Sequence, residues 1–121
     1  MTDQTQPSAD LAQPSADQAQ PSAARQMLGD FAPKLVDVTD DVLFGDMWKR
    51  EEMSPRDRSL VTITALVVGG NAEQLPFHLN LGKDNGLTES EIVEAITHLA
   101  FYAGWPKAMS AIGAAKKTFS E

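Results

Sequence analysis

Apolar residues recur at helical spacing along most of the chain after residue 24. Between residues 25 and 48 they fall mostly three or four positions apart, which places them on one side of a helix. Pro33 suits the first position of a helix, because its fixed backbone angle is already helical and its missing N–H is not needed there. We therefore predict a short helix near 25–30 and a longer one near 33–47.

The next segment carries a helix start. A Ser-Pro-Arg-Asp sequence begins at Ser54; serine suits the N-cap, proline the first helical position and aspartate the positive end of the helix dipole. The body that follows, residues 60–68, is rich in β-branched side chains and resembles a buried strand. The capping signal and the length of the segment favour a buried helix, which ends at Gly69 and Gly70.

A further helical pattern covers residues 72–84 and ends at Gly86, since glycine suits the left-handed position that follows a helix. Pro76 leaves two alternatives, because proline has no N–H to donate to the helix. Either it lies in the first turn of a helix that begins near Leu75, or it kinks one that begins near Asn71.

The clearest helix start is a capping box, Thr-Glu-Ser-Glu, that begins at Thr88. It opens an amphipathic helix that runs to about Ala103. Gly104 and Pro106 then make a corner, and a last, alanine-rich helix covers residues 107–119. No strand pattern remains, so the sequence predicts an all-α fold.

The first 24 residues have a different character. A Gln-Pro-Ser-Ala unit recurs every seven residues from Gln6, and Leu11 is the only large apolar side chain within the repeats. The recurring proline breaks every helical turn, so this is not a coiled coil. With little to bury, residues 1–24 are expected to form a disordered leader, and residues 25–121 a single domain.

Composition narrows the classes of function. The chain of 121 residues has a formal net charge of -7 and no cysteine. A negative charge argues against nucleic acid and anionic membrane surfaces as partners, and no apolar run approaches the roughly 20 residues of a membrane span. The N-terminal segment lacks the basic start and apolar run of a secretory signal, so a cytoplasmic location is expected. No spacing of histidines and carboxylates favours a metal site.

Few side chains offer catalytic chemistry. His78 lies between two large apolar residues on a predicted helix that also carries Glu73, and a kink at Pro76 would bring the two together. A packed or surface position is the alternative for His78, and more so for His98. Neither alternative is decided by the pattern alone.

Arginines and aromatic residues leave similar choices. Arg56 and Arg58 lie at the start of a predicted helix, where they form an exposed ion pair or recognise a substrate carboxylate. Trp48, Tyr102 and Trp105 are core or interface aromatics, or they line a pocket.

Four stretches of the chain together resemble the carboxymuconolactone decarboxylase family: residues 54–63, 73–79, 85–94 and 102–108. The resemblance covers about residues 25–121. It implies an all-helical fold of the alkyl hydroperoxidase D type, a bundle of crossing helices that accommodates the six predicted here. It also implies a homotrimer or a homohexamer. The last two predicted helices carry more apolar surface than so small a domain can bury alone, which favours an oligomer independently.

The family has a peroxidase branch and a decarboxylase branch. The resemblance implies that members of the peroxidase branch carry a Cys-x-x-Cys sequence with histidine four positions after it. Counted back from His78, those cysteines would stand at Asn71 and Gln74, and the glutamate of that branch would stand at Ser59. Because no thiol is present, the chain resembles the cysteine-free branch, and disulfide-based peroxide reduction is excluded.

The decarboxylase branch implies chemistry without a cofactor. Loss of carbon dioxide from an unsaturated lactone acid leaves a dienolate, which needs an oxyanion donor, an acid, and cations for the carboxylates of a small-molecule substrate. His78 is implied as the acid or oxyanion donor, with Glu73 as its orienting partner. The predicted site comprises catalytic His78 and Glu73, and substrate-binding Arg58, Arg56, Trp48 and Trp105.

Three functions fit these observations. The first is a cofactor-free lyase that acts on carboxymuconolactone or a related small lactone acid. The second is a family member with another small acid or ketone as substrate. The third is a non-catalytic helical oligomer that binds a ligand or a partner protein.

Overall fold

The computed structural model describes residues 20–121. Contacts divide the chain into two compact units, with their boundary in the sequence between Met53 and Ser54. Each unit is described by itself. Residues 1–19 of the predicted leader lie outside the described residues. Every regular element within residues 20–121 is helical, and no strand occurs there, so the predicted all-α class is confirmed.

The N-terminal unit is built from short helical pieces. They are α1 (Ala23–Leu28), α2 (Pro33–Val38), the π-helix η2 (Thr39–Phe44) and the 3₁₀ helix η3 (Met47–Lys49). The Oγ of Ser22 caps α1 by accepting the N–H of Arg25 at 3.0 Å, and the same hydroxyl donates to Asp40 of η2 at 2.9 Å. The first helix therefore begins two residues before its predicted start, in the last Gln-Pro-Ser-Ala repeat.

The second predicted helix, near 33–47, is regular over only part of its length. It begins at Pro33 as predicted, is α-helical to Val38, and continues as a π-helix to Phe44. At the change, the hydroxyl of Thr39 donates to the carbonyl of Leu35 at 2.7 Å. This side-chain bond competes with the backbone bond for the same carbonyl, as threonine often does within helices.

The C-terminal unit contains four longer helices and one short turn. They are α3 (Pro55–Gly69), the 3₁₀ turn η4 (Ala72–Gln74), α4 (Leu75–Asp84), α5 (Glu89–Ala103) and α6 (Trp105–Ser120). Two predicted caps are confirmed. The Oγ of Ser54 accepts the N–H of Asp57 at 3.1 Å, and Thr88 and Glu91 exchange the two 3.0 Å hydrogen bonds of a capping box.

The structure also decides between the two alternatives for Pro76. The helix begins at Leu75 and Pro76 lies in its first turn, where its missing N–H has no partner to lose. The preceding residues form the separate turn η4 rather than the first half of a kinked helix. Gly86 follows α4 with φ of 110°, a left-handed conformation that glycine adopts without strain.

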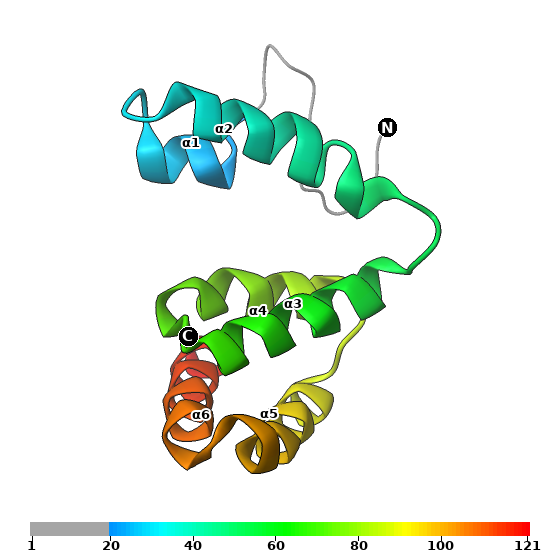
Figure 1. Ribbon diagram of the computed structural model, residues 1–121, viewed down its shortest axis with the longest axis vertical. Helices are drawn as coiled ribbons and strands as arrows, with labels where there is room; N and C mark the ends of the chain where they lie inside the picture. Colours follow the sequence, from blue (N-terminus) through cyan, green and yellow to red (C-terminus); the bar gives the residue numbers. More distant parts are fainter. Residues whose placement is uncertain (1–19) are drawn as a thin grey trace. The chain divides into compact units, whose positions relative to one another are not determined.

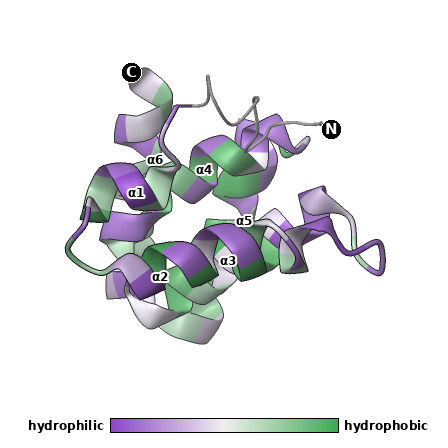
Figure 2. Cartoon of the chain, turned by 90° about the horizontal axis from the view of Figure 1, so that it is seen from above, coloured by the Kyte–Doolittle hydropathy of each residue, from purple (hydrophilic) through white to green (hydrophobic). Residues whose placement is uncertain are grey.

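The core of the C-terminal unit lies between its four helices. Figure 1 shows α3 and α4 side by side with α5 and α6 beneath them, and contacts join α3 to α5 and α4 to α6. Figure 2 colours the helices by hydropathy. After Arg58, α3 is apolar on most sides, so Ile63 and Val67 are buried while Val61 and Val68 stay exposed. The buried cluster comprises Ile63, Val67, Leu75, Leu79, Leu87, Ile92, Ile96, Leu99, Ala100, Ala108, Ala111 and Ala115.

Gly82 lets α4 approach α3 closely. A Cβ atom at this position would lie 3.1 Å from Leu87 and 3.2 Å from Ile63, with Ser59 at 3.7 Å, so even alanine would require the methyl groups of Leu87 and Ile63 to shift. Because Asn85 lies further along α4 and contacts the start of α3, the two helices run antiparallel. The antiparallel packing of α3 on α4 determines how far apart His78 and Arg58 lie along the two helices.

Within residues 20–121, no helix is both long enough and apolar enough to cross a membrane.

Candidate functional site

His78 lies on α4, one turn after Leu75, and is half-buried. Its Nδ1 atom is shielded from solvent, and its ring meets the ring of Phe77 edge-on, with centroids 5.0 Å apart. Burial lowers the pKa of His78 below its ordinary value, because the charged imidazolium loses hydration on burial. The imidazole is therefore neutral at pH 7.

The packing of α3 on α4 determines which turn of α3 lies opposite His78. Gly82 lies over Ser59 and Ile63, and His78 lies one turn before Gly82 on the same side of α4. Since the helices are antiparallel, His78 is level with the turn that follows Ile63. Arg58 belongs to the beginning of α3, so the two residues are separated by about 10 Å along the helix axis.

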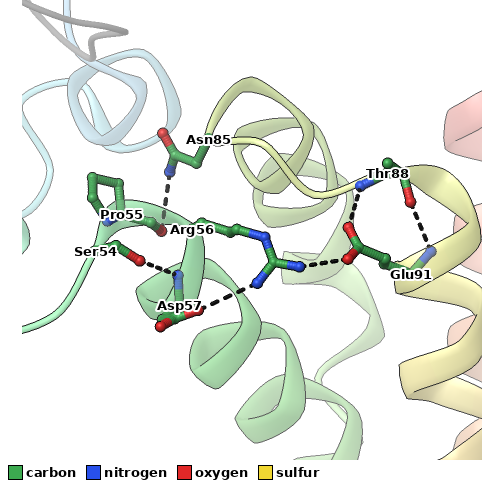
Figure 3. A network of polar contacts seen from close by, with 7 residues as sticks. All are labelled: Ser54, Pro55, Arg56, Asp57, Asn85, Thr88 and Glu91. Carbon is green, nitrogen blue, oxygen red and sulfur yellow. Dashed lines mark hydrogen bonds and ion pairs between the residues drawn. The ribbon is translucent and has the colours of Figure 1, made fainter.

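Arg56 and Arg58 lie two residues apart in different surroundings. The guanidinium of Arg56 donates to Asp57 at 3.3 Å and pairs with Glu91 at the start of α5, as Figure 3 shows. The pKa of Glu91 is lowered, first by the hydrogen bond from the N–H of Thr88 and also by Arg56. The charge of Arg56 is thus balanced by two carboxylates, which a substrate carboxylate would have to displace.

Arg58 lies in the first turn of α3 with its Nε atom shielded from solvent. Its backbone N–H donates to the carbonyl of Ser54 at 2.9 Å, and its carbonyl accepts from the hydroxyl of Thr62 at 2.8 Å. Both ends of this residue's peptide unit are therefore held in the helix. The side chain as a whole is half-buried, a position from which a guanidinium retains much of its electrostatic strength.

The other predicted site residues are Glu73, Trp105 and Trp48. Glu73 is exposed in η4. Trp105 begins α6, is 56% exposed and meets Phe101 edge-on at 5.2 Å. Trp48 lies in η3 of the N-terminal unit, where its ring stacks on Phe44 at 5.8 Å. Their roles in a site stay predictions.

Two polar residues of this region were missed by the sequence reasoning. Ser59 is fully buried, and its Oγ accepts a hydrogen bond from Nδ2 of Asn85 at 3.0 Å. Ser59 was considered only as the residue that replaces a glutamate, and Asn85 was not considered as a site residue. The signal was a serine at a position where the helical pattern of α3 requires an apolar side chain.

No group of three or more histidines, cysteines, aspartates or glutamates gathers as a metal site among residues 20–121. His98, the second histidine of the domain, is exposed on α5 and packs against the ring of Tyr102 at 5.1 Å. His78 is therefore the histidine with the shielded surroundings.

Comparison with known proteins identifies the family of the chain. Residues 33–117 match the model of the carboxymuconolactone decarboxylase family. The chain belongs to this family. It contains no cysteine, which is consistent with the cysteine-free branch that the sequence resembled.

Two curated relatives are similar over much of the domain. The chain is 33% identical over 94 residues to 4-carboxymuconolactone decarboxylase of Acinetobacter baylyi, a match that covers 78% of this chain and 70% of that protein. It is 35% identical over 79 residues to nitrosuccinic acid decarboxylase of Metarhizium robertsii, which covers 64% of this chain and 54% of that protein. Both relatives are named as decarboxylases.

Proposed function

We propose that the chain is a cofactor-free carboxy-lyase for a small acid, with 4-carboxymuconolactone as the first candidate substrate. The names of both relatives support decarboxylation. The observation that carries the proposal is His78, a half-buried histidine with a lowered pKa on α4. Perturbed groups of this kind are concentrated at functional sites.

The neutral state of the His78 imidazole favours one of the two roles predicted for it, oxyanion donor or acid. Breaking the carbon–carbon bond to the departing carboxylate sends its electron pair into the conjugated lactone carbonyl, whose oxygen becomes negative. A neutral imidazole donates one N–H bond to such an oxygen, which stabilises the dienolate. It is a poor proton donor, because it would become an imidazolate. His78 therefore acts as the oxyanion donor, and the closing protonation at carbon falls to water.

Arg58 supplies the cation for the carboxylate that the substrate keeps. It lies on the same helix pair as His78, and the separation of about 10 Å along the axis is bridged by an arginine side chain and a small acid together. For Arg56 to bind the same carboxylate, the substrate would have to displace Asp57 and Glu91. For Glu73 to orient His78, the exposed side chain of Glu73 would have to turn toward the imidazole.

Nitrosuccinic acid is a second candidate substrate, suggested by the second relative. Loss of carbon dioxide from the carbon that bears the nitro group sends the electron pair into that group and forms a nitronate. The chemical demands are the same as for the lactone: a donor for the developing negative oxygen and a cation for the remaining carboxylate.

We also propose a homotrimer or a homohexamer in the cytoplasm, with Trp105 and Trp48 as pocket-lining residues. The assembly is supported by large side chains of α5 and α6 that remain exposed: Phe101 by 74%, Tyr102 by 76% and Met109 by 64%. Exposed apolar groups of this size are typical of contact surfaces. A sedimentation mass equal to one chain would contradict the assembly.

The test of the proposed function is an ultraviolet assay of the purified full chain with each candidate acid. His78→Ala is expected to lower kcat by about a hundredfold or more. His98→Ala, which removes the exposed histidine of α5, is the matched control and should keep full turnover. Equal rates for all three proteins would refute the role of His78. No turnover of either acid by the unmodified chain would refute the proposed substrates and favour a non-catalytic oligomer.

A further inference from the structure

One polar side chain, that of Ser59, is fully buried among the residues that the structure describes. It faces Gly82 across the close contact of α3 and α4. The hydroxyl accepts a hydrogen bond from Nδ2 of Asn85 at 3.0 Å, which offsets the cost of burying it. Alanine at this position would bury no polar group at all, so packing alone does not require the hydroxyl.

The amide of Asn85 reaches a second point on α3. Its Nδ2 atom also lies 3.5 Å from the carbonyl oxygen of Pro55, a long contact that Figure 3 draws. An amide nitrogen carries two hydrogens, so one side chain at the end of α4 spans the first turn of α3, from Pro55 to Ser59. The Arg56–Glu91 ion pair ties the same turn to the start of α5.

Arg58 stands directly before Ser59 on this turn. Its backbone is held by Ser54 and Thr62, and its Nε atom is shielded from solvent. A guanidinium binds a carboxylate strongly only when its N–H groups are aligned with the two oxygens. A displacement of the turn by a fraction of an ångström therefore weakens the contact.

We propose that Ser59 and Asn85 form a positioning pair that fixes the first turn of α3 and so aligns Arg58 with the substrate carboxylate. The inference rests on the proposed function, in which Arg58 binds that carboxylate. Neither Ser59 nor Asn85 touches the substrate. Loss of the pair consequently weakens substrate binding, and leaves the step at His78 unchanged.

The first experiment replaces Ser59 by alanine in the full chain. Alanine favours a helix more than serine does, so this variant keeps its fold. We expect KM to rise about fivefold, as for the loss of one ordinary hydrogen bond, while kcat stays within about twofold. Ser110→Ala, an exposed serine on α6, is the matched control and should change neither constant. An unchanged KM in Ser59→Ala would overturn the proposal.

The second experiment asks whether the pair acts through Arg58. In an Arg58→Lys chain the planar fork of donors is absent, so alignment no longer matters. Adding Ser59→Ala to that chain is expected to leave KM unchanged. If the addition raises KM by the same factor as in the unmodified chain, the two positions are independent and the proposal is wrong.

A third measurement needs no substrate. Amide hydrogen exchange at Arg58 and Ser59 should become faster in Asn85→Ala, whereas Asn80→Ala, an exposed asparagine on α4, should leave it unchanged. If the unmodified chain turns over neither acid, the proposed function fails, and with it the role of the pair in substrate binding. Exchange still decides whether the pair holds the first turn of α3: faster exchange supports this, and unchanged exchange overturns it.

Discussion

The two units of the chain differ in how much they bury. In residues 20–53 the only buried side chain is Val36, and large apolar groups such as Met27 and Phe31 are 79% and 92% exposed. In residues 54–121 four long helices close over a continuous apolar cluster. Helices of six residues, such as α1 and α2, gain little from their backbone alone. The stability described here therefore resides in the C-terminal unit.

The chemistry follows the same division. Five of the six predicted site residues, namely His78, Glu73, Arg58, Arg56 and Trp105, belong to the C-terminal unit, and only Trp48 belongs to the other. A site that depends on alignment is best carried by rigid elements. Paired substitutions, most of them with one member in each unit, test the contrast between the two units.

The largest contrast is expected from core truncation. Ile96→Ala removes a side chain that is 0% exposed, and should lower the free energy of unfolding by about 3 kcal/mol because a cavity remains. Phe31→Ala removes a larger but exposed group, and should change it by less than about 0.5 kcal/mol. Urea titration followed by circular dichroism measures both. Equal losses would show that the N-terminal unit shares the main core.

Helix caps give the next contrast. Thr88→Ala removes the capping box of α5, and should lower the free energy of unfolding by about 1 kcal/mol. Ser22→Ala removes the cap of α1 and its bond to Asp40, and should leave the main urea transition in place while exposing the amide of Arg25 to faster exchange. A shift of the main transition by Ser22→Ala as large as that caused by Thr88→Ala would contradict the division into units.

The sequence predicted the caps and most helix boundaries because these depend on local chemistry. Ser54 and Thr88 were identified from neighbours within three residues, and the structure confirms both. The change to a π-helix at Thr39 was missed, since a threonine that bonds to the preceding turn also occurs in regular helices. The start of α6 at Trp105, two residues before its predicted start, falls within the usual uncertainty of helix ends.

The candidate site was less predictable, because it depends on which helices pack together. The sequence identified the histidine and both arginines as candidates. It did not show that Glu91, 35 positions away, pairs with Arg56, or that Asn85 bonds to Ser59. Such contacts follow from the antiparallel packing of α3 on α4, which no local pattern reveals.

Acidification tests the burial of His78 within the C-terminal unit. Burial lowers the pKa of His78, so below about pH 6.5 the unfolded chain takes up a proton that the folded chain does not. The free energy of unfolding should thus fall as the pH drops below that value, and level off below the folded pKa. Urea midpoints over this range measure the fall. His78→Gln should reduce this fall; a fall in His78→Gln as large as in the unmodified chain would contradict the cause.

The smallest contrast concerns exposed ion pairs. Arg56→Gln breaks the pairs with Asp57 and Glu91, and should lower the free energy of unfolding by at most about 1 kcal/mol. Arg25→Gln breaks a pair with Asp30, whose side chain is 97% exposed, and should have no measurable effect. KM should be unchanged in Arg25→Gln.

The most direct measurement of the central claim is carbon dioxide release from 4-carboxymuconolactone, followed by mass spectrometry alongside loss of the lactone acid. The account predicts that the unmodified chain releases one carbon dioxide for each substrate molecule consumed, and that His78→Ala slows both processes by about a hundredfold or more. Consumption of the lactone without carbon dioxide release, or release that is unaffected by His78→Ala, would contradict it.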